Sequence, residues 1–184
     1  TVNDLAMSGA RPLYIAAAFI LEEGLSTEEL GRIVESMRAA AGEAGALLVT
    51  GDTKVVNRGK GDRVFITTTG LGVIESPVSI SANRARPGDR VLLSGYIGDH
   101  GMAVLSQREN LEFEGAIESD TAPLHTLVQA MVAAAPDPAE EIRCLRDPTR
   151  GGVAATLNEI AARSGVGMEL EEKAIPVREA VQGA

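Results

Sequence analysis

Tryptophan is absent from this sequence, cysteine occurs once, and only 3% of the residues are aromatic. The core must therefore be built mainly from aliphatic side chains. The single cysteine, Cys144, cannot form an internal disulfide, which favours a reducing compartment, and we expect the cytoplasm. Lysine and arginine form no dense stretch, and 26 acidic against 17 basic residues give a net charge of −9. We therefore expect no nucleic-acid partner, because phosphates require a basic face.

Long apolar runs are missing as well. The longest, residues 13–21, has nine residues and is too short to cross a bilayer, so we expect no membrane partner. The 184 residues, 45% hydrophobic and 23% charged, fit one large or two small soluble globular domains. Thr1 already lies inside an amphipathic pattern, and residues 175–184 stop just after a predicted helix start. We therefore expect an internal fragment of a longer protein.

Alternating helix and strand signals in the first half predict an α/β domain. Residues 1–8 have the pattern of a helix end, and the apolar run 13–21 is more typical of a buried strand than of a helix. Residues 26–29 (STEE) match a capping box and precede apolar side chains at helical spacing, which predicts an amphipathic helix ending at Gly42–Gly45. The β-branched residues 63–74 predict a strand whose glycines indicate a bulge or a close backbone approach.

The stretch 46–60 combines a strand with a candidate ligand loop. The apolar run 46–49 predicts a short buried strand that stops at a glycine-led turn, Gly51-Asp52-Thr53-Lys54. This turn presents a carboxylate, a hydroxyl and an ammonium together at the end of the strand. Ligands usually bind at that place in open α/β sheets.

A composition shift at residues 76–89, with two prolines and several turn formers, predicts a domain junction. We place the boundary so that the N-terminal domain is 1–78 and the C-terminal domain is 79–184. In the second domain we expect two strands and three helices. The strands are 91–94 and 166–170, and the helices end near Arg108, near Val132 and at Gly165.

Four polar clusters at element ends combine a carboxylate with a nearby glycine: Asn3-Asp4, Gly51–Lys54, Gly98–Gly101 and Asp147–Gly152. Amides freed by glycines and helix starts bind phosphate oxygens, and Lys54 and Arg150 add positive charge. A carboxylate about 4 Å from a phosphate charge is repelled by roughly 4 kcal/mol at an effective dielectric near 20. A divalent cation between them turns this cost into coordination, as Mg²⁺ does with carboxylates and phosphates. The clusters therefore favour a metal-bound nucleotide.

Each cluster also has a purely structural interpretation. A Gly-Asp turn is commonly only a turn, and Asp147-Pro-Thr149 can cap the helix that follows it. We interpret His100 as a surface capping residue, His125 as part of a solvated helix and Cys144 as a small, semi-buried residue. Neither a GxxxxGK[ST] nor a GxGxxG motif is present, so a standard P-loop or Rossmann site is not supported.

Five strings, in this order and spacing, resemble the HypE family of hydrogenase maturation factors: TVNDLAMSGARP, FILEEGL, LLVTGDTKVV, LLSGYIGDHGMAVLSQRE and LRDPTRGGVAATLNEIA. That family belongs to the aminoimidazole-ribonucleotide-synthetase-like (PurM-like) ATP-binding superfamily. The resemblance covers essentially all 184 residues. The Asn-Asp and Gly-Asp-Thr pieces are shared across the superfamily, whereas GDTKVV, SG-x-IGDHG and RDPTRGG are more specific.

The resemblance implies a PurM-like two-domain fold, α/β and α+β. A mixed-sheet N-terminal domain would dimerise through its sheet, beside a C-terminal α+β domain, and the cofactors would be ATP and Mg²⁺. A HypF-type carbamoyltransferase would load a carbamoyl group onto the thiol of a C-terminal cysteine. ATP-dependent dehydration of this thiocarboxamide would give a thiocyanate, whose cyanide a HypC/HypD-type maturation complex accepts for [NiFe]-hydrogenase.

The resemblance gives roles to particular residues of this sequence. Asp4 and Asp52 would hold Mg²⁺ and through it the ATP phosphates, and Asn3 and Thr53 would support that network. Lys54 would face the phosphates and the modified thiol, so Lys54 and Asp52 are the catalytic candidates. Five residues would close the site from the second domain: Asp147, Thr149, Arg150, Gly151 and Gly152. Asp99 and His100 are further candidates for the nucleotide site, and a structural role is the alternative for both.

Several features of the family are not found in these residues. They are the N-terminal glycine-rich segment, the Asp-bearing first strand, the asparagine-glutamate loop and the terminal cysteine that carries the substrate. Cys144 does not replace that cysteine, because it lies just before RDPTRGG. We therefore predict that this chain alone binds nucleotide weakly and turns over nothing.

Two other functions stay open at this point. The first is another ATP enzyme of the same fold: thiamine-phosphate kinase, selenophosphate synthetase or the ribonucleotide synthetase itself. The second is a non-catalytic dimerisation and docking module that recruits a partner through its acidic surface.

Overall fold

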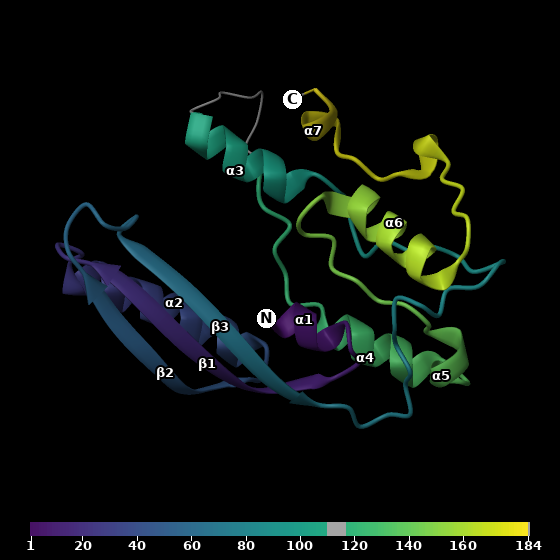
Figure 1. The fold of residues 1–184 in the computed structure, drawn as a ribbon, viewed down its shortest axis with the longest axis horizontal. Helices are drawn as coiled ribbons and strands as arrows, with labels where there is room; N and C mark the ends of the chain where they lie inside the picture. Colours follow the sequence, from purple (N-terminus) through teal and green to yellow (C-terminus); the bar gives the residue numbers. More distant parts are fainter. Residues whose placement is uncertain (110–116, 184) are drawn as a thin grey trace. The chain divides into compact units, whose positions relative to one another are not determined.

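The computed structural model describes residues 1–109 and 117–183, and Figure 1 labels its helices and strands. The chain forms two compact units. The first is Thr1–Ser81 with Pro123–Asp147, and the second is Ala82–Ala122 with Pro148–Ala184. Residues 123–147 therefore belong with the N-terminal part of the chain, although a sequence boundary at 78/79 assigns them to the second domain.

The first unit is built on a three-stranded mixed sheet in the order β2-β1-β3. The central strand β1 (Arg11–Glu22) is parallel to β2 (Leu47–Val56) and antiparallel to β3 (Val64–Val73). The apolar run 13–21 is therefore a strand, as predicted, and so is the stretch 63–74. The mixed sheet expected for the N-terminal domain is confirmed.

Two helices pack on this sheet, α1 (Val2–Ala6) against β1 and β3, and α2 (Thr27–Glu43) against β2. The capping box is confirmed, since Ser26 Oγ accepts the backbone N–H of Glu29 at 3.1 Å. Gly70 of β3 lies under α1, where a Cβ atom would come within 2.8 Å of Leu5 Cδ1. This is the close backbone approach that the strand glycines indicate. The buried core beside the helices contains Ile15, Ala44 and Ala46.

β2 differs from the sequence prediction in two ways. Gly51-Asp52-Thr53-Lys54 lies inside the strand and not on a turn after it, because β1 runs alongside as far as the pair Glu22–Val56. Gly51 permits this pairing, since a Cβ atom there would collide with the carbonyl oxygen of Ala17. The strand is also not buried, and Leu47 is 62% exposed. The reason is that β2 is an edge of the described sheet.

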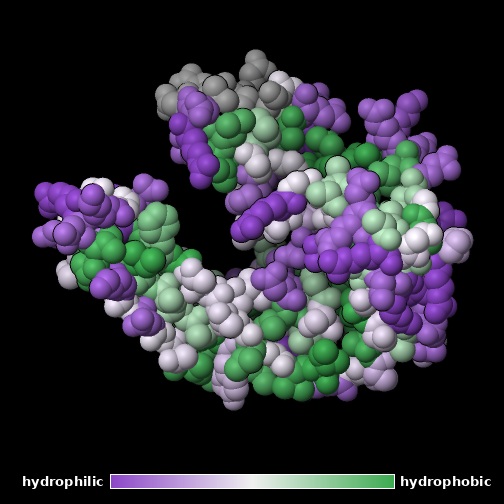
Figure 2. All heavy atoms as spheres, in the orientation of Figure 1, coloured by the Kyte–Doolittle hydropathy of each residue, from purple (hydrophilic) through white to green (hydrophobic). Residues whose placement is uncertain are grey.

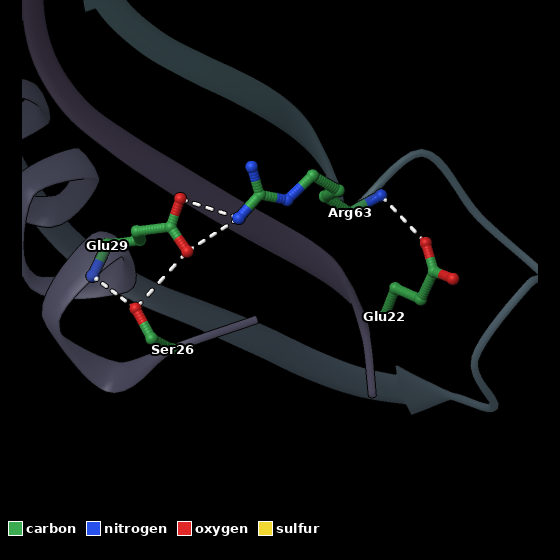
Figure 3. Close-up of polar contacts among 4 residues, drawn as sticks. All are labelled: Glu22, Ser26, Glu29 and Arg63. Carbon is green, nitrogen blue, oxygen red and sulfur yellow. Dashed lines mark hydrogen bonds and ion pairs between the residues drawn. The ribbon is translucent and has the colours of Figure 1, made fainter. Parts of the chain in front are cut away.

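A charged network ties the connection between β2 and β3 to the start of α2 (Figure 3). The carboxylate of Glu22 accepts the backbone N–H of Gly59 and, at 3.0 Å, that of Arg63. Arg63 has a left-handed backbone (φ 70°), and its Nη2 donates to both carboxylate oxygens of Glu29 at 2.6 Å. The backbone N–H groups of Arg63 and Gly59 lower the pKa of Glu22, and the Arg63 guanidinium lowers the pKa of Glu29.

The remaining helices divide between the two units. α4 (His125–Ala134) and α5 (Pro138–Glu141) complete the first unit. The second unit holds α3 (Asp99–Glu109), α6 (Gly152–Ser164), a 3-10 turn (Glu172–Ala174) and α7 (Glu179–Gln182). α3, α4 and α6 confirm the three predicted helices. Within residues 1–109 and 117–183, no helix is both long and apolar enough to cross a membrane.

Three predictions for the later part of the chain are wrong. Residues 91–94 and 166–170 are not strands, because no described segment pairs with either of them to form a hydrogen-bond ladder. Leu92 is accordingly 82% exposed. His125 is not on a solvated face but is 8% exposed, because α4 packs on α1 and β1.

Candidate functional site

The β2 residues of the candidate site lie along one exposed strand. Asp52 and Lys54 pair in register with Ala18 and Ile20 of β1. Asp52 Oδ1 accepts the backbone N–H of Thr53 at 2.9 Å. Asp52 and Thr53 also line a shallow groove of about 400 Å³ between the sheet and α2. The strand therefore presents a carboxylate, a hydroxyl and an ammonium to solvent.

Asn3 and Asp4 lie on α1, which is held on the sheet. Thr1 Oγ1 of the helix start is 2.5 Å from Thr68 Oγ1 of β3. The Asp4 carboxylate is 73% exposed, with one oxygen 3.7 Å from the amino group of Thr1. The side chain of Asn3 instead contacts the protein, since its Oδ1 accepts the backbone N–H of Leu124 at 2.8 Å.

Asp4 and Asp52 each offer the carboxylate oxygens that Mg²⁺ prefers, and both residues are exposed to solvent. In the described part of the chain, no group of three or more His, Cys, Asp or Glu side chains is placed to hold a metal ion. A cation at these carboxylates would therefore take its other ligands from phosphate oxygens and water. That arrangement is usual for Mg²⁺.

The glycines of the RDPTRGG string begin α6. Gly151 and Gly152 are both left-handed (φ 75° and 61°), and a Cβ atom at Gly151 would lie 2.6 Å from that of Ala155. Gly151 is the N-cap and no side chain caps the helix, so the interpretation of Asp147-Pro-Thr149 as a cap is wrong. The backbone N–H of Gly152 donates to the Thr149 carbonyl at 3.2 Å. A helix start without a side-chain cap is suited to binding an anion through its other first-turn amides.

The ten predicted site residues divide between the two units. Six belong to the first unit: Asn3, Asp4, Asp52, Thr53, Lys54 and Asp147. Four belong to the second: Thr149, Arg150, Gly151 and Gly152. Thr149 and Arg150 are exposed, and Asp147 is partly buried.

Asp99 has a structural role in the second unit. Its carboxylate is 2% exposed and accepts Nε–H of Arg178 at 2.7 Å, which raises the pKa of Arg178. The guanidinium lies 4.5 Å from the centre of the Tyr96 ring. Sequence reasoning missed this cluster, because Asp99 and Arg178 are 79 positions apart and no local pattern pairs them. The neighbouring His100 is exposed, with Nδ1 2.9 Å from Ser119 Oγ.

Two family models match the chain. The N-terminal domain of AIR synthase related proteins matches residues 1–74, and the C-terminal domain of the same proteins matches residues 86–183. The chain belongs to the AIR synthase related family. The PurM-like two-domain fold class predicted from the sequence is thereby confirmed.

Individual relatives within this family sharpen the comparison. Carbamoyl dehydratase HypE of Azotobacter vinelandii is 65% identical over 184 residues, which are 100% of this chain and 53% of that protein. A crystal structure of a HypE-HypF complex matches with a TM-score of 0.94 at 52% identity, over 100% of this chain and 59% of that chain. A crystal structure of HypE in complex with ATP gives the same score and identity, over 53% of that chain.

These matches confirm the resemblance to HypE that the five sequence strings indicate. The chain spans about half the length of the curated relatives that it matches.

Proposed function

We propose that the protein containing this chain is an ATP-dependent carbamoyl dehydratase of hydrogenase maturation. The observation that carries the proposal is the 65% identity, over the whole chain, to a protein of that name. The described geometry supports it, because α1 and β2 expose two carboxylates and an ammonium, and no side chain caps the start of α6. Both features suit a nucleotide bound through a cation.

In this proposal the first unit supplies the metal ligands. Asp4 and Asp52 hold Mg²⁺, which when bound neutralises the ATP phosphates. Asn3 and Thr53 support these carboxylates. Lys54 faces the phosphates and the modified thiol and balances negative charge as phosphate departs. Five further residues contribute contacts to the nucleotide: Asp147, Thr149, Arg150, Gly151 and Gly152.

The proposed substrate is a cysteine whose sulfur carries a carbamoyl group. Its amide oxygen is a poor leaving group, so transfer of the γ-phosphoryl group of ATP to that oxygen lets phosphate leave instead. The C–O bond breaks, the nitrogen loses both protons, and the carbon–nitrogen bond becomes triple. The products are a thiocyanate, ADP and phosphate. In this proposal Cys144 is not the reacting thiol, because it lies just before RDPTRGG, and its Sγ donates to the carbonyl of Ser81 at 3.1 Å.

We propose a homodimer formed through the sheet. Tyr14 of β1 pairs in register with Leu47 and Leu71, and Ile20 pairs with Phe65, so apolar side chains form rows across the strands. All five are exposed. Figure 2 shows apolar (green) atoms open on the surface at the lower left of the view, where Figure 1 draws the sheet. Contiguous exposed apolar surface of this kind marks an interaction site.

Other partners follow from the same proposal. A HypF-type carbamoyltransferase loads the carbamoyl group, in keeping with the solved complex of a relative. A HypC/HypD-type complex accepts the cyanide, and the reaction takes place in the cytoplasm.

Titration of the full-length protein with Mg-ATP tests the proposal. We expect binding that Asp52→Asn abolishes, because the substitution removes the charge that holds the cation. Asp62→Asn, an exposed aspartate between β2 and β3, is the control and should bind as wild type does. No binding at millimolar ATP would instead support a non-catalytic docking module. Phosphorylation of thiamine phosphate, or another reaction of that fold, would support a different ATP enzyme.

The isolated 184-residue chain is expected to turn over nothing, since it holds no carbamoylated tail cysteine. Cyanation of a thiol by this piece alone, measured by thiocyanate release, would contradict the assignment of the substrate to a separate cysteine.

A further inference from the structure

The segment Pro123–Asp147 is fastened to the first unit at both ends. At its start, the backbone N–H of Leu124 donates to Asn3 Oδ1 at 2.8 Å, across 121 positions of sequence. At its end, the carbonyl of Arg143 accepts the backbone N–H of Ser81 at 2.9 Å, and Cys144 Sγ donates to the Ser81 carbonyl. The segment therefore behaves as a strap that leads to Asp147, the last residue of this unit.

The contact at the start of the strap serves a backbone group that its own helix leaves unpaired. Leu124 is the N-cap of α4 and has no side-chain cap, because leucine offers no acceptor. The first four N–H groups of a helix have no partner within it. Asn3 satisfies one of them from another helix, and the adjoining His125 and Val128 are buried. Asn3 is thus a tertiary cap for α4.

The hydrogen bond between Asn3 and Leu124 also affects the position of Asp4, which lies next to Asn3 on α1. α1 has only five residues, and a helix that short does not persist in water without tertiary contacts. Its position depends on the packing of Val2 and the burial of Ala6. It also depends on the contacts of Thr1 with Thr68, Leu5 over Gly70 and Asn3 with Leu124. Asn3 is the neighbour of Asp4, so loss of its contact loosens the helix where the carboxylate is carried.

We propose that Asn3 is a positioning residue, which joins α1 to the start of α4 and so fixes Asp4 in the first unit, without its carboxamide contacting nucleotide. The role of Asp4 in this statement rests on the proposed function. The capping contact itself does not.

The test uses three variants of the full-length protein. Asn3→Ala removes the acceptor, and Asn3→Asp keeps an oxygen at the same place. Ser8→Ala is the matched control, because it removes one side-chain bond to backbone, Ser8 Oγ to the Leu5 carbonyl, just beyond the other end of α1. The measurements are amide hydrogen exchange of the peptide containing Leu124 and the dissociation constant of Mg-ATP.

We expect Asn3→Ala to speed exchange of the Leu124 amide and weaken Mg-ATP binding by about five- to tenfold, which corresponds to one hydrogen bond of about 1 kcal/mol. Ser8→Ala should keep both quantities within about threefold of wild type, a margin that is under 1 kcal/mol. Asn3→Asp should keep the exchange of the Leu124 amide within the same margin, because its carboxylate oxygen still accepts that N–H. Should Asn3→Ala fail to fold, the exchange of the Leu124 amide in Asn3→Asp decides alone.

Other results overturn the proposal. Unchanged exchange in Asn3→Ala, or lost protection in Asn3→Asp, would show that Asn3 does not cap α4. Protected exchange combined with lost Mg-ATP binding in Asn3→Ala would show that the carboxamide contacts the nucleotide itself. Failure of the wild type to bind Mg-ATP would overturn the proposed function and the positioning role together, while the exchange data would still decide the cap.

Discussion

Gly51 decides the path of the strand that carries the candidate site. Its neighbour Ala17 approaches so closely that a Cβ atom would collide with the Ala17 carbonyl oxygen. The glycine is therefore needed for strand pairing and not for a turn. Asp52 and Lys54 follow as parts of a paired strand, which gives their backbones fixed positions.

Gly51→Ala should lower the free energy of unfolding by about 1–3 kcal/mol, the usual cost of forcing extra atoms into a packed place. Urea unfolding of the full-length protein measures this. Gly42→Ala in α2 is the matched control, because a Cβ atom added at Gly42 would meet no neighbouring atom within 4 Å. The control should raise the free energy of unfolding by up to about 1 kcal/mol, since alanine has a higher helix propensity than glycine. Equal effects of the two changes would contradict the close approach at Gly51.

The hydrogen bonds of the Glu22 carboxylate predict that the protein loses stability in acid. The N–H groups of Arg63 and Gly59 lower its pKa in the folded state, so the unfolded state binds a proton more readily. The stabilisation is complete above the unfolded pKa of about 4.3, and it disappears as the pH falls through the lower folded value. Unfolding free energies measured from about pH 6 downward should therefore fall in acid, and less steeply in Glu22→Gln. If the unfolding free energy of Glu22→Gln falls with pH as steeply as that of the wild type, the network of Figure 3 is not a cause of the acid destabilisation.

At the scale of elements, two helix starts in the second unit differ in chemistry. α6 begins with two left-handed glycines and no capping side chain, and the Gly152 N–H donates to the Thr149 carbonyl, so a ligand would meet the other first-turn amides. α3 begins with the buried carboxylate of Asp99, which is held by Arg178 from near α7. The first start suits a binding role and the second a structural one.

Arg178→Met should destabilise the second unit by about 3 kcal/mol, because it leaves the buried Asp99 carboxylate without its partner. Thermal and urea unfolding with a fluorescent or exchange probe in residues 96–99 measure this. Arg163→Met is the control, since its pair with Glu159 within α6 is solvent-exposed and should cost less than about 0.5 kcal/mol. A similar cost for both arginines would show that burial of Asp99 does not matter.

At the scale of the whole molecule, the exposed apolar rows of the sheet predict self-association. Leu71→Lys places a charge in the row formed with Tyr14 and Leu47, and it should weaken dimerisation of the full-length protein by roughly 100-fold or more, since a buried unpaired charge costs at least about 3 kcal/mol. Sedimentation velocity over a concentration series measures the dissociation constant. Leu170→Lys, also exposed but in the second unit, should leave it unchanged. A dimer that survives Leu71→Lys would place the interface elsewhere.

Some of this protein was determined by sequence alone. β1, the capped α2, β3 and the glycine-ended α6 follow from local patterns, because caps, periodicity and left-handed glycines act within a few residues. The family also followed from sequence, since GDTKVV and RDPTRGG are continuous strings. The roles of Asp52, Lys54 and Arg150 stay predictions.

Only the tertiary structure decided the features that depend on distant partners. β2 continues through Gly51–Lys54 because β1 pairs with it, whereas 91–94 stays unpaired for lack of a described neighbour. His125 is buried because α4 packs on α1 and β1, which its own apolar spacing does not reveal. The contact of Asn3 with Leu124 spans 121 positions. Long-range pairing and burial are set by which segments meet in space, and local residue patterns contain no record of that choice.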